Sequence, residues 1–85
     1  MNIQLRFFAS IREALGTSQE ALVLPDHVQT IGDVRHFLVQ RGGNWAVALG
    51  EGRALRMAYN QEMTGAATRI TDACEVAFFP PVTGG

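Results

Sequence analysis

The chain has 85 residues, a length that accommodates one compact domain. Hydrophobic residues make up 47% of it and charged residues 18%, and the net charge is -1, a balance that argues against intrinsic disorder. Its basic residues are all arginines, which are offset by acids and do not cluster, so we expect no nucleic-acid-binding surface. Short apolar runs, no signal-peptide pattern and a single cysteine predict a cytoplasmic protein without membrane contact.

The N-terminal part of the chain predicts two strands separated by a short helix. Ile3–Phe7 alternates apolar and polar residues with period two, as a strand with one buried face does. Ser10–Glu13 has the spacing of a capping box, which predicts a helix over Ile11–Leu15 that ends at a left-handed Gly16. Ala21–Leu24 predicts a second strand, at the sheet edge or antiparallel to the first.

The main helix is predicted to begin at Thr30. Asp33 completes a capping box with Thr30 and places a carboxylate in the first turn, where the helix dipole favours it. Gly42-Gly43 is expected to end the helix. Apolar side chains on one helical face predict packing on a sheet. These side chains are Ile31, Val34 and Leu38.

The C-terminal part predicts further strands. Leu55–Asn60 and Glu75–Phe79 read as strands, Met63–Thr68 as a shorter one, and Thr71–Cys74 as a turn. The segment Asn44–Gly52 fits either a turn of helix or an irregular packed segment. We therefore expect strands on both sides of one amphipathic helix, with a mixed sheet wrapped over that helix.

This element order predicts an α+β protein with the β-grasp (ubiquitin-like) fold. The expected architecture is a mixed four- to five-stranded sheet packed on one main helix, with one or two short extra helices. A ferredoxin-like fold needs two helices of similar size, and Ile11–Leu15 is too short for that. We expect the domain to occupy residues 1–79 and a flexible Gly-Gly tail to occupy residues 80–85.

The C-terminus carries the most informative pattern. Pro80 and Pro81 remove two backbone donors directly after an apolar strand, so strand pairing should stop there. They also favour an extended path, along which the tail would reach roughly 20 Å at about 3.3–3.6 Å per residue. The final residues, Gly84 and Gly85, fit a narrow channel well. A frayed terminus is the alternative, but it needs no stiff base.

Nearly the whole chain resembles the small subunits of molybdopterin synthase. The motifs that carry the resemblance are Phe7-Phe8-Ala9, Arg12-Glu13, Trp45-Ala46, Ala48-Leu49, Asn60-Gln61 and the terminal run Glu75-Val76-Ala77-Phe78-Phe79-Pro80-Pro81-Val82-Thr83-Gly84-Gly85. The match is loose over residues 54–68 apart from Asn60-Gln61. The turn before the last strand also departs from the family, which usually carries Gly and Asp where Ala73 and Cys74 stand.

The resemblance implies a β-grasp sulfur carrier without an active site of its own. In this family an E1-like adenylyltransferase uses ATP to adenylate the last glycine, here Gly85, which then becomes a thiocarboxylate. The tail enters the large catalytic subunit and donates sulfur to cyclic pyranopterin monophosphate, forming the molybdopterin dithiolene of the molybdenum cofactor. Two small and two large subunits form a heterotetramer. The residues expected to deliver the tail are Pro80, Pro81, Val82, Thr83 and Gly84.

Four residues are candidates for docking a partner. Strand alternation points Phe79 away from the helix-covered face, and Phe8 alternates onto the same side, although it could instead pack under the short helix. Arg12 is expected on that helix, where it pairs with an acidic partner or remains a solvated cation. Met63 fits either an adaptable contact or the core.

No residue set in the chain predicts catalysis or metal binding. Cys74 lies at a predicted turn beside an acidic residue, which does not favour a reactive thiolate. His27 and His36 lie on a loop and a helix without the ligand spacing of a metal site, so we expect exposed histidines and no bound cofactor.

Other functions fit the same ending. A sulfur carrier for thiamine synthesis shares the fold and the Gly-Gly end, but lacks the Phe-Phe-Pro-Pro run. A ubiquitin-like modifier would be conjugated through Gly85 to lysines of other proteins; with no lysine of its own, this chain could not form lysine-linked chains. A binding module with an inert tail is the remaining alternative.

Overall fold

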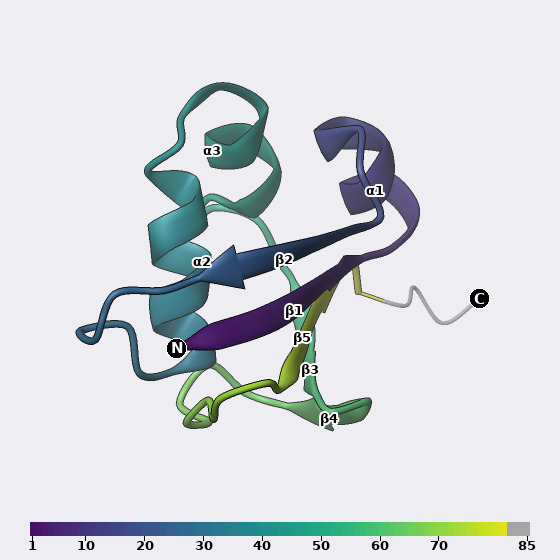
Figure 1. Cartoon of the computed structure of the whole chain (residues 1–85). Coiled ribbons are helices and arrows are strands. Elements are labelled where there is room, and N and C mark those ends of the chain that lie inside the picture. Colours follow the sequence, from purple (N-terminus) through teal and green to yellow (C-terminus); the bar gives the residue numbers. More distant parts are fainter. Residues whose placement is uncertain (82–85) are drawn as a thin grey trace.

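A five-stranded mixed sheet packed on helices forms the structure, a computed structural model that describes residues 1–81 (Figure 1). The strand order is β2-β1-β5-β3-β4. In chain order the elements are β1 (Asn2–Phe7), α1 (Ala9–Leu15), β2 (Gln19–Val23), α2 (Ile31–Val39), α3 (Gly43–Leu49), β3 (Arg56–Tyr59), β4 (Glu62–Thr64) and β5 (Glu75–Phe79). This is the β-grasp arrangement expected from the sequence, with α2 as the main helix and two shorter helices.

The first and last strands lie side by side in the middle of the sheet. β1 runs parallel to β5, with Phe7 opposite Phe78, and antiparallel to β2 at the edge. β3 runs antiparallel to both β5 and β4. Because β1 and β5 run in the same direction, Met1 and Pro81 lie at opposite ends of the sheet (Figure 1).

The core lies between the sheet and the helices. The rings of Phe7 and Phe78 stack with centroids 6.5 Å apart, and Trp45 approaches Phe7 edge-on at 5.6 Å. Each fully buried side chain of this size stabilises the fold by about 1.5–3 kcal/mol. The other fully buried side chains are Ile3, Leu5, Ile31, Val34, Leu38, Leu49 and Val76.

The capping box of α2 is confirmed. The Asp33 amide donates to Thr30 Oγ1 at 3.1 Å, and the Thr30 amide donates to Asp33 Oδ2 at 3.2 Å. The Asp33 carboxylate also accepts a hydrogen bond from the Gln29 amide at 3.0 Å. This bond and those from Thr30 lower the pKa of the Asp33 carboxyl, the Gln29 bond having the largest effect. The predicted end of α2 is wrong: the helix stops at Val39, and Gly42-Gly43 instead begins α3.

The capping box predicted for α1 is wrong. The helix begins at Ala9, and Phe8 is its N-cap without a side-chain hydrogen bond. The chain leaves β1 through a tight turn in which Ala9 has φ +52°, so Ser10 already lies inside the helix. Gly16 ends α1 with φ +73°, as predicted.

An ion pair fastens the edge strand to the segment after α2. Arg41 donates both Nη atoms to the Glu20 carboxylate, at 2.9 and 2.5 Å, and its guanidinium lies 4.4 Å from the Trp45 ring centroid. The hydrogen bonds from Arg41 lower the pKa of the Glu20 carboxyl against the opposing effect of burial. β2 is thereby held over the helices.

The short strand β4 is connected to β3 by a two-residue turn. Asn60 and Gln61 have φ +47° and +70°, as a tight hairpin of this length requires. The Asn60 side chain also accepts a hydrogen bond from the Glu75 amide at 2.8 Å. The strand predicted over Met63–Thr68 stops at Thr64, because the chain turns at Gly65 and crosses to the start of α2.

Ala73 should be less favourable than glycine at its position. Its φ is +65°, where a Cβ is strained, and its amide donates to the Asn2 carbonyl at 2.7 Å. We expect Ala73→Gly to raise the free energy of unfolding by about 0.5–1 kcal/mol, the relief of strain less the added freedom of the unfolded chain. Denaturant unfolding measures it. The control, Ala54→Gly at an exposed position without positive φ, should lower stability, and a destabilised Ala73→Gly would contradict the account.

Candidate functional site

An apolar patch lies on the face of the sheet turned away from the helices. It is formed by five residues, which we call the outer patch: Phe8, Ala58, Met63, Ala77 and Phe79. The ladder places Ala77 opposite Ala58 and Ala58 opposite Met63, which puts all three on one face of the sheet. Ala58 and Ala77 are covered by neighbouring side chains, yet neither is in the core cluster.

The two phenylalanines of the outer patch contact each other. Their ring centroids lie 6.2 Å apart in an edge-to-face arrangement. Phe8 is 41% exposed and Phe79 is half-buried, so Phe8 does not pack under α1. Met63 is 58% exposed, two strands away from Phe79. Three predicted docking residues therefore lie on one face, beside the point where β5 ends.

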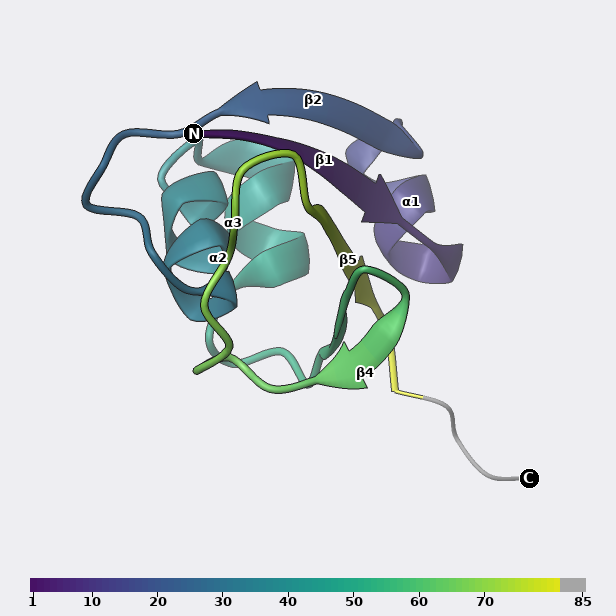
Figure 2. The same cartoon turned by 60° about the horizontal axis from the view of Figure 1, so that its bottom comes forward.

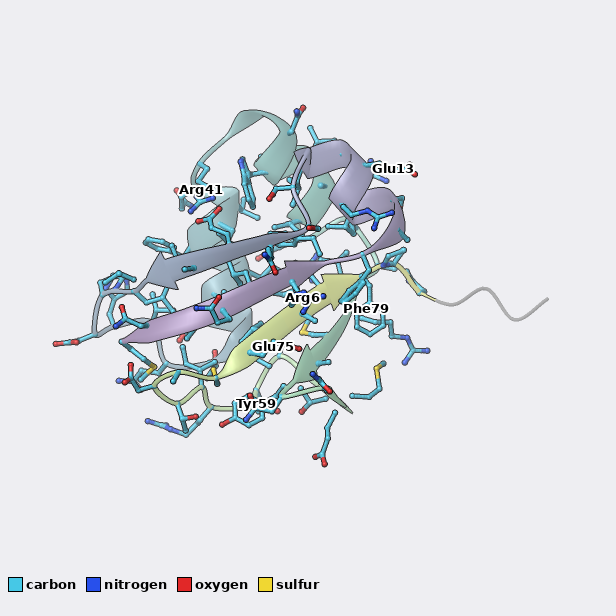
Figure 3. All side chains as sticks on the ribbon, turned by 45° about the vertical axis from the view of Figure 1, so that its right-hand side comes forward. Arg6, Glu13, Arg41, Tyr59, Glu75 and Phe79 are labelled. Atoms are coloured by element: carbon cyan, nitrogen blue, oxygen red, sulfur yellow. The ribbon has the colours of Figure 1, made fainter. Side chains whose placement is uncertain are left out.

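Arg6 borders the outer patch and was missed by the sequence prediction. Its guanidinium lies 5.6 Å from the Phe8 ring centroid and 3.8 Å from the Glu75 carboxylate. Figure 3 shows Arg6, Glu75 and Phe79 together on this face. Within residues 1–81 the buried Arg6 Nε has no acceptor. The period-two alternation that placed Phe8 outside would also have placed Arg6 there, because Phe8 continues the extended backbone of β1 and lies two residues after Arg6.

Arg12 lies beside the outer patch but outside it. Arg12 is exposed on α1, and its backbone amide donates a hydrogen bond to the Phe8 carbonyl one helical turn earlier. Among the described residues its side chain forms no ion pair. This position leaves the guanidinium available to an acidic group, and the role itself stays a prediction.

The base of the tail lies in a groove between α1 and the connection from α3 to β3. Strand pairing ends at Phe79, whose partner is Arg56, so the ladder stops before the prolines as predicted. Pro80 is half-buried and Pro81 is exposed. The groove has a volume of about 480 Å³. Its lining residues are Ser10, Ile11, Ala14, Val47, Ala48, Gly52, Arg53, Ala54, Leu55, Pro80 and Pro81.

The remaining tail residues lie outside the described part of the chain. These residues are Val82, Thr83, Gly84 and Gly85. Their expected roles in tail delivery and sulfur binding therefore stay predictions. The structure does show where the tail begins: Pro80 directly follows β5, the strand that ends beside α1, and lines one groove with residues of α1. The course of β5 can be followed in Figure 2.

The described residues contain no grouping that resembles a catalytic or metal centre. Cys74 is buried, with 2% of its surface exposed, and follows the strained Ala73. His27 and His36 are both exposed. Between residues 1 and 81 no three His, Cys, Asp or Glu side chains could hold a metal ion, and no helix is long and apolar enough to cross a membrane. The described residues therefore provide an apolar face of the sheet next to the point where Pro80 follows β5.

Known proteins resemble this chain over its full length. The model of the ThiS family matches residues 5–85. The molybdopterin synthase sulfur carrier subunit of Haemophilus influenzae is 41% identical over 83 residues, covering 98% of this chain and 99% of that protein. The protein of the same name from Escherichia coli is 40% identical, with the same coverage.

Solved structures share the fold. The small archaeal modifier protein 1 of Haloferax volcanii aligns with a TM-score of 0.74 and 22% identity, over 95% of this chain and 98% of that one. A chain from the complex of subunits 1 and 2 of the molybdopterin-converting factor of Helicobacter pylori aligns over 100% of both chains, with a TM-score of 0.66 and 21% identity. At these identities the likeness establishes the β-grasp fold alone.

Proposed function

The chain belongs to the ThiS family, and we propose that it is the sulfur carrier subunit of a molybdopterin synthase. The observation that carries this proposal is the end-to-end match, at 40% and 41% identity, to two proteins of that name. The structure supports it through the outer patch beside the base of the tail. The proposed role needs a surface that docks and a chain end that reacts, and no catalytic residue.

The proposed chemistry takes place at the carboxyl group of Gly85. A carboxylate resists nucleophiles because of its charge and resonance. An E1-like adenylyltransferase uses ATP to join it to AMP, with release of pyrophosphate. A sulfur nucleophile then displaces AMP, and the product is a thiocarboxylate, ionised near neutral pH as sulfur acids of low pKa are. Its sulfur is donated to cyclic pyranopterin monophosphate to build the dithiolene.

The large synthase subunit and the adenylyltransferase are the proposed partners. Subunits 1 and 2 of the Helicobacter pylori factor form a protein-protein complex, which supports the first of these. We propose a heterotetramer of two small and two large chains. Both partners must enclose the tail from Pro81 onward, so both approach the side of the domain that carries Phe79. They would therefore bind this chain in turn and not together.

Each alternative function differs from the proposed one either in the partner that the chain binds or in the product formed at its terminus. A thiamine sulfur carrier would also form a thiocarboxylate, but would not bind the large synthase subunit. A ubiquitin-like modifier would form an amide between Gly85 and an amine of another protein. The 22% identity with the small archaeal modifier protein 1 supports a common fold and does not favour this function.

Removal of Gly85 should abolish sulfur loading and leave the fold unchanged. The core residues all lie at or before Phe78, so thermal unfolding should be unaffected. Intact mass after incubation with the adenylyltransferase, ATP and a sulfur donor reports loading. The matched control is Cys74→Ala, which removes the only thiol of the chain and should still load. Loss of loading in folded Cys74→Ala, or loading without Gly85, would contradict the proposal.

Phe79→Ala should weaken binding to the large subunit by about 30-fold, as truncation of a central aromatic side chain does at interfaces. Calorimetry measures the affinity, and thermal unfolding checks that the variant is folded. Val23→Ala is the matched control, because Val23 is 73% exposed on the distant edge strand β2. Its affinity should equal that of the wild type. An unchanged affinity of Phe79→Ala would exclude the outer patch as the docking surface.

A further inference from the structure

Arg35, on α2, donates three hydrogen bonds to backbone carbonyls at the end of α3 and in the segment that follows it. Its Nε donates to the Leu49 carbonyl at 2.6 Å. One terminal nitrogen, Nη2, donates to the Gly50 carbonyl at 2.6 Å and to the Arg53 carbonyl at 2.9 Å. Within residues 1–81 Arg35 forms no ion pair with a carboxylate. The guanidinium therefore holds one short backbone segment, residues 49–53, from the neighbouring helix.

The Leu49 carbonyl group at the end of α3 would lack a hydrogen-bond donor from residues 1–81 without the Arg35 guanidinium. The last carbonyls of a helix have no partners within it, and α3 has neither a basic residue in its last turn nor a left-handed C-cap. Its C-cap, Gly50, is extended with φ -60° and ψ 158°. A Cβ on Gly50 would lie 2.5 Å from the Ala46 carbonyl oxygen, so the segment is tightly placed. Arg35 supplies from α2 the cap that α3 lacks.

The segment held by Arg35 forms one wall of the groove at the base of the tail. The Arg53 amide donates to the Gly50 carbonyl at 2.9 Å, and Arg53 Nε donates to the Val47 carbonyl at 3.1 Å. Arg53 lines the groove together with Pro80 and Pro81. Three residues further on, Arg56 begins β3 and pairs with Phe79. The hydrogen bonds of Arg35 thus hold a segment that lines the groove where the chain leaves β5.

We propose that Arg35 is a positioning residue for the C-terminal tail, an inference that rests on the proposed function. It fixes the connection from α3 to β3, and that wall fixes the direction in which Pro80 and Pro81 leave the sheet. A tail that leaves in one direction loses less conformational freedom when a partner encloses it. If Arg35 acts in this way, its replacement lowers the affinity for the partner only when the tail is present. If Arg35 instead supports the fold or contacts the partner directly, its replacement lowers the affinity with or without the tail.

A double-mutant cycle between Arg35 and the tail tests this directly. Arg35→Lys keeps the charge but replaces the planar fork, which uses two separate nitrogens to reach the three carbonyls, by a compact ammonium group without that geometry. We expect it to weaken binding of the full chain to the large subunit by about tenfold, and by less than about twofold in a chain that lacks Gly84 and Gly85. Calorimetry with the four chains gives the affinities.

A second measurement and two further variants accompany the cycle. Hydrogen exchange of the Arg53 amide should be faster in Arg35→Lys, with exchange in β1 unchanged. Gly50→Ala should displace the same segment, because the added Cβ would clash with the Ala46 carbonyl oxygen. If Arg35→Lys does not fold, Gly50→Ala should show the same pattern, a larger loss of affinity in the full chain than in the shortened chain. Arg69→Lys is the matched control. Among the described residues the Arg69 side chain donates only to the Gln29 side chain, so its replacement should not change the affinity for the large subunit.

Equal losses of affinity in the full and the shortened chain would overturn the positioning role. That result would mean that Arg35 supports the fold or touches the partner. If the wild-type chain itself fails to bind the large subunit, the proposed function is contradicted as well, because no carrier interaction then exists. If the wild type binds and loses affinity when Gly84 and Gly85 are removed, the proposed function stands whatever Arg35 does.

Discussion

The parallel pairing of β1 with β5 is the constraint on which the rest of the structure depends. Its register sets Phe7 opposite Phe78, and both rings enter the core. Because successive side chains point to opposite faces of a strand, the next residues, Phe8 and Phe79, must point outward, where they meet. A slip of one residue would exchange the two faces. One register therefore places the core side chains, the phenylalanines of the outer patch and the point where the chain leaves β5.

This arrangement separates the folded domain from the chemistry assigned to it. The domain contributes a sheet whose last strand ends at Phe79, and the proposed reacting group is the carboxyl group of Gly85, six residues further along the sequence. The absence of a catalytic grouping among residues 1–81 is compatible with such a division, because in the proposed function the partners would supply the activation and the acceptor. The absence of lysine is compatible too, because an activated terminus meets no side-chain amine on its own chain.

Local patterns predicted most of the fold, and contacts between distant residues account for what was missed. Period-two alternation located β1, the apolar segment after the predicted turn at Thr71–Cys74 located β5, and the spacing of Thr30 and Asp33 located the start of α2. The sequence also placed Phe8 and Phe79 on the outer face. By contrast, the start of α1 depends on a tight turn at Ala9, and the cap of α3 comes from Arg35 on another helix. Neither has a signature in neighbouring residues, because a guanidinium that binds distant carbonyls looks like any exposed arginine.

The central claim is that sulfur travels on the C-terminal carboxyl group of this chain. The most direct test is the intact mass of the chain purified from its own host under sulfur-replete conditions. The account predicts a population in which one terminal oxygen is replaced by sulfur, and which returns to the carboxylate form on incubation with the large synthase subunit and its pterin substrate. A terminus that is always an unmodified carboxylate, or that is found as an amide with other proteins, would contradict it.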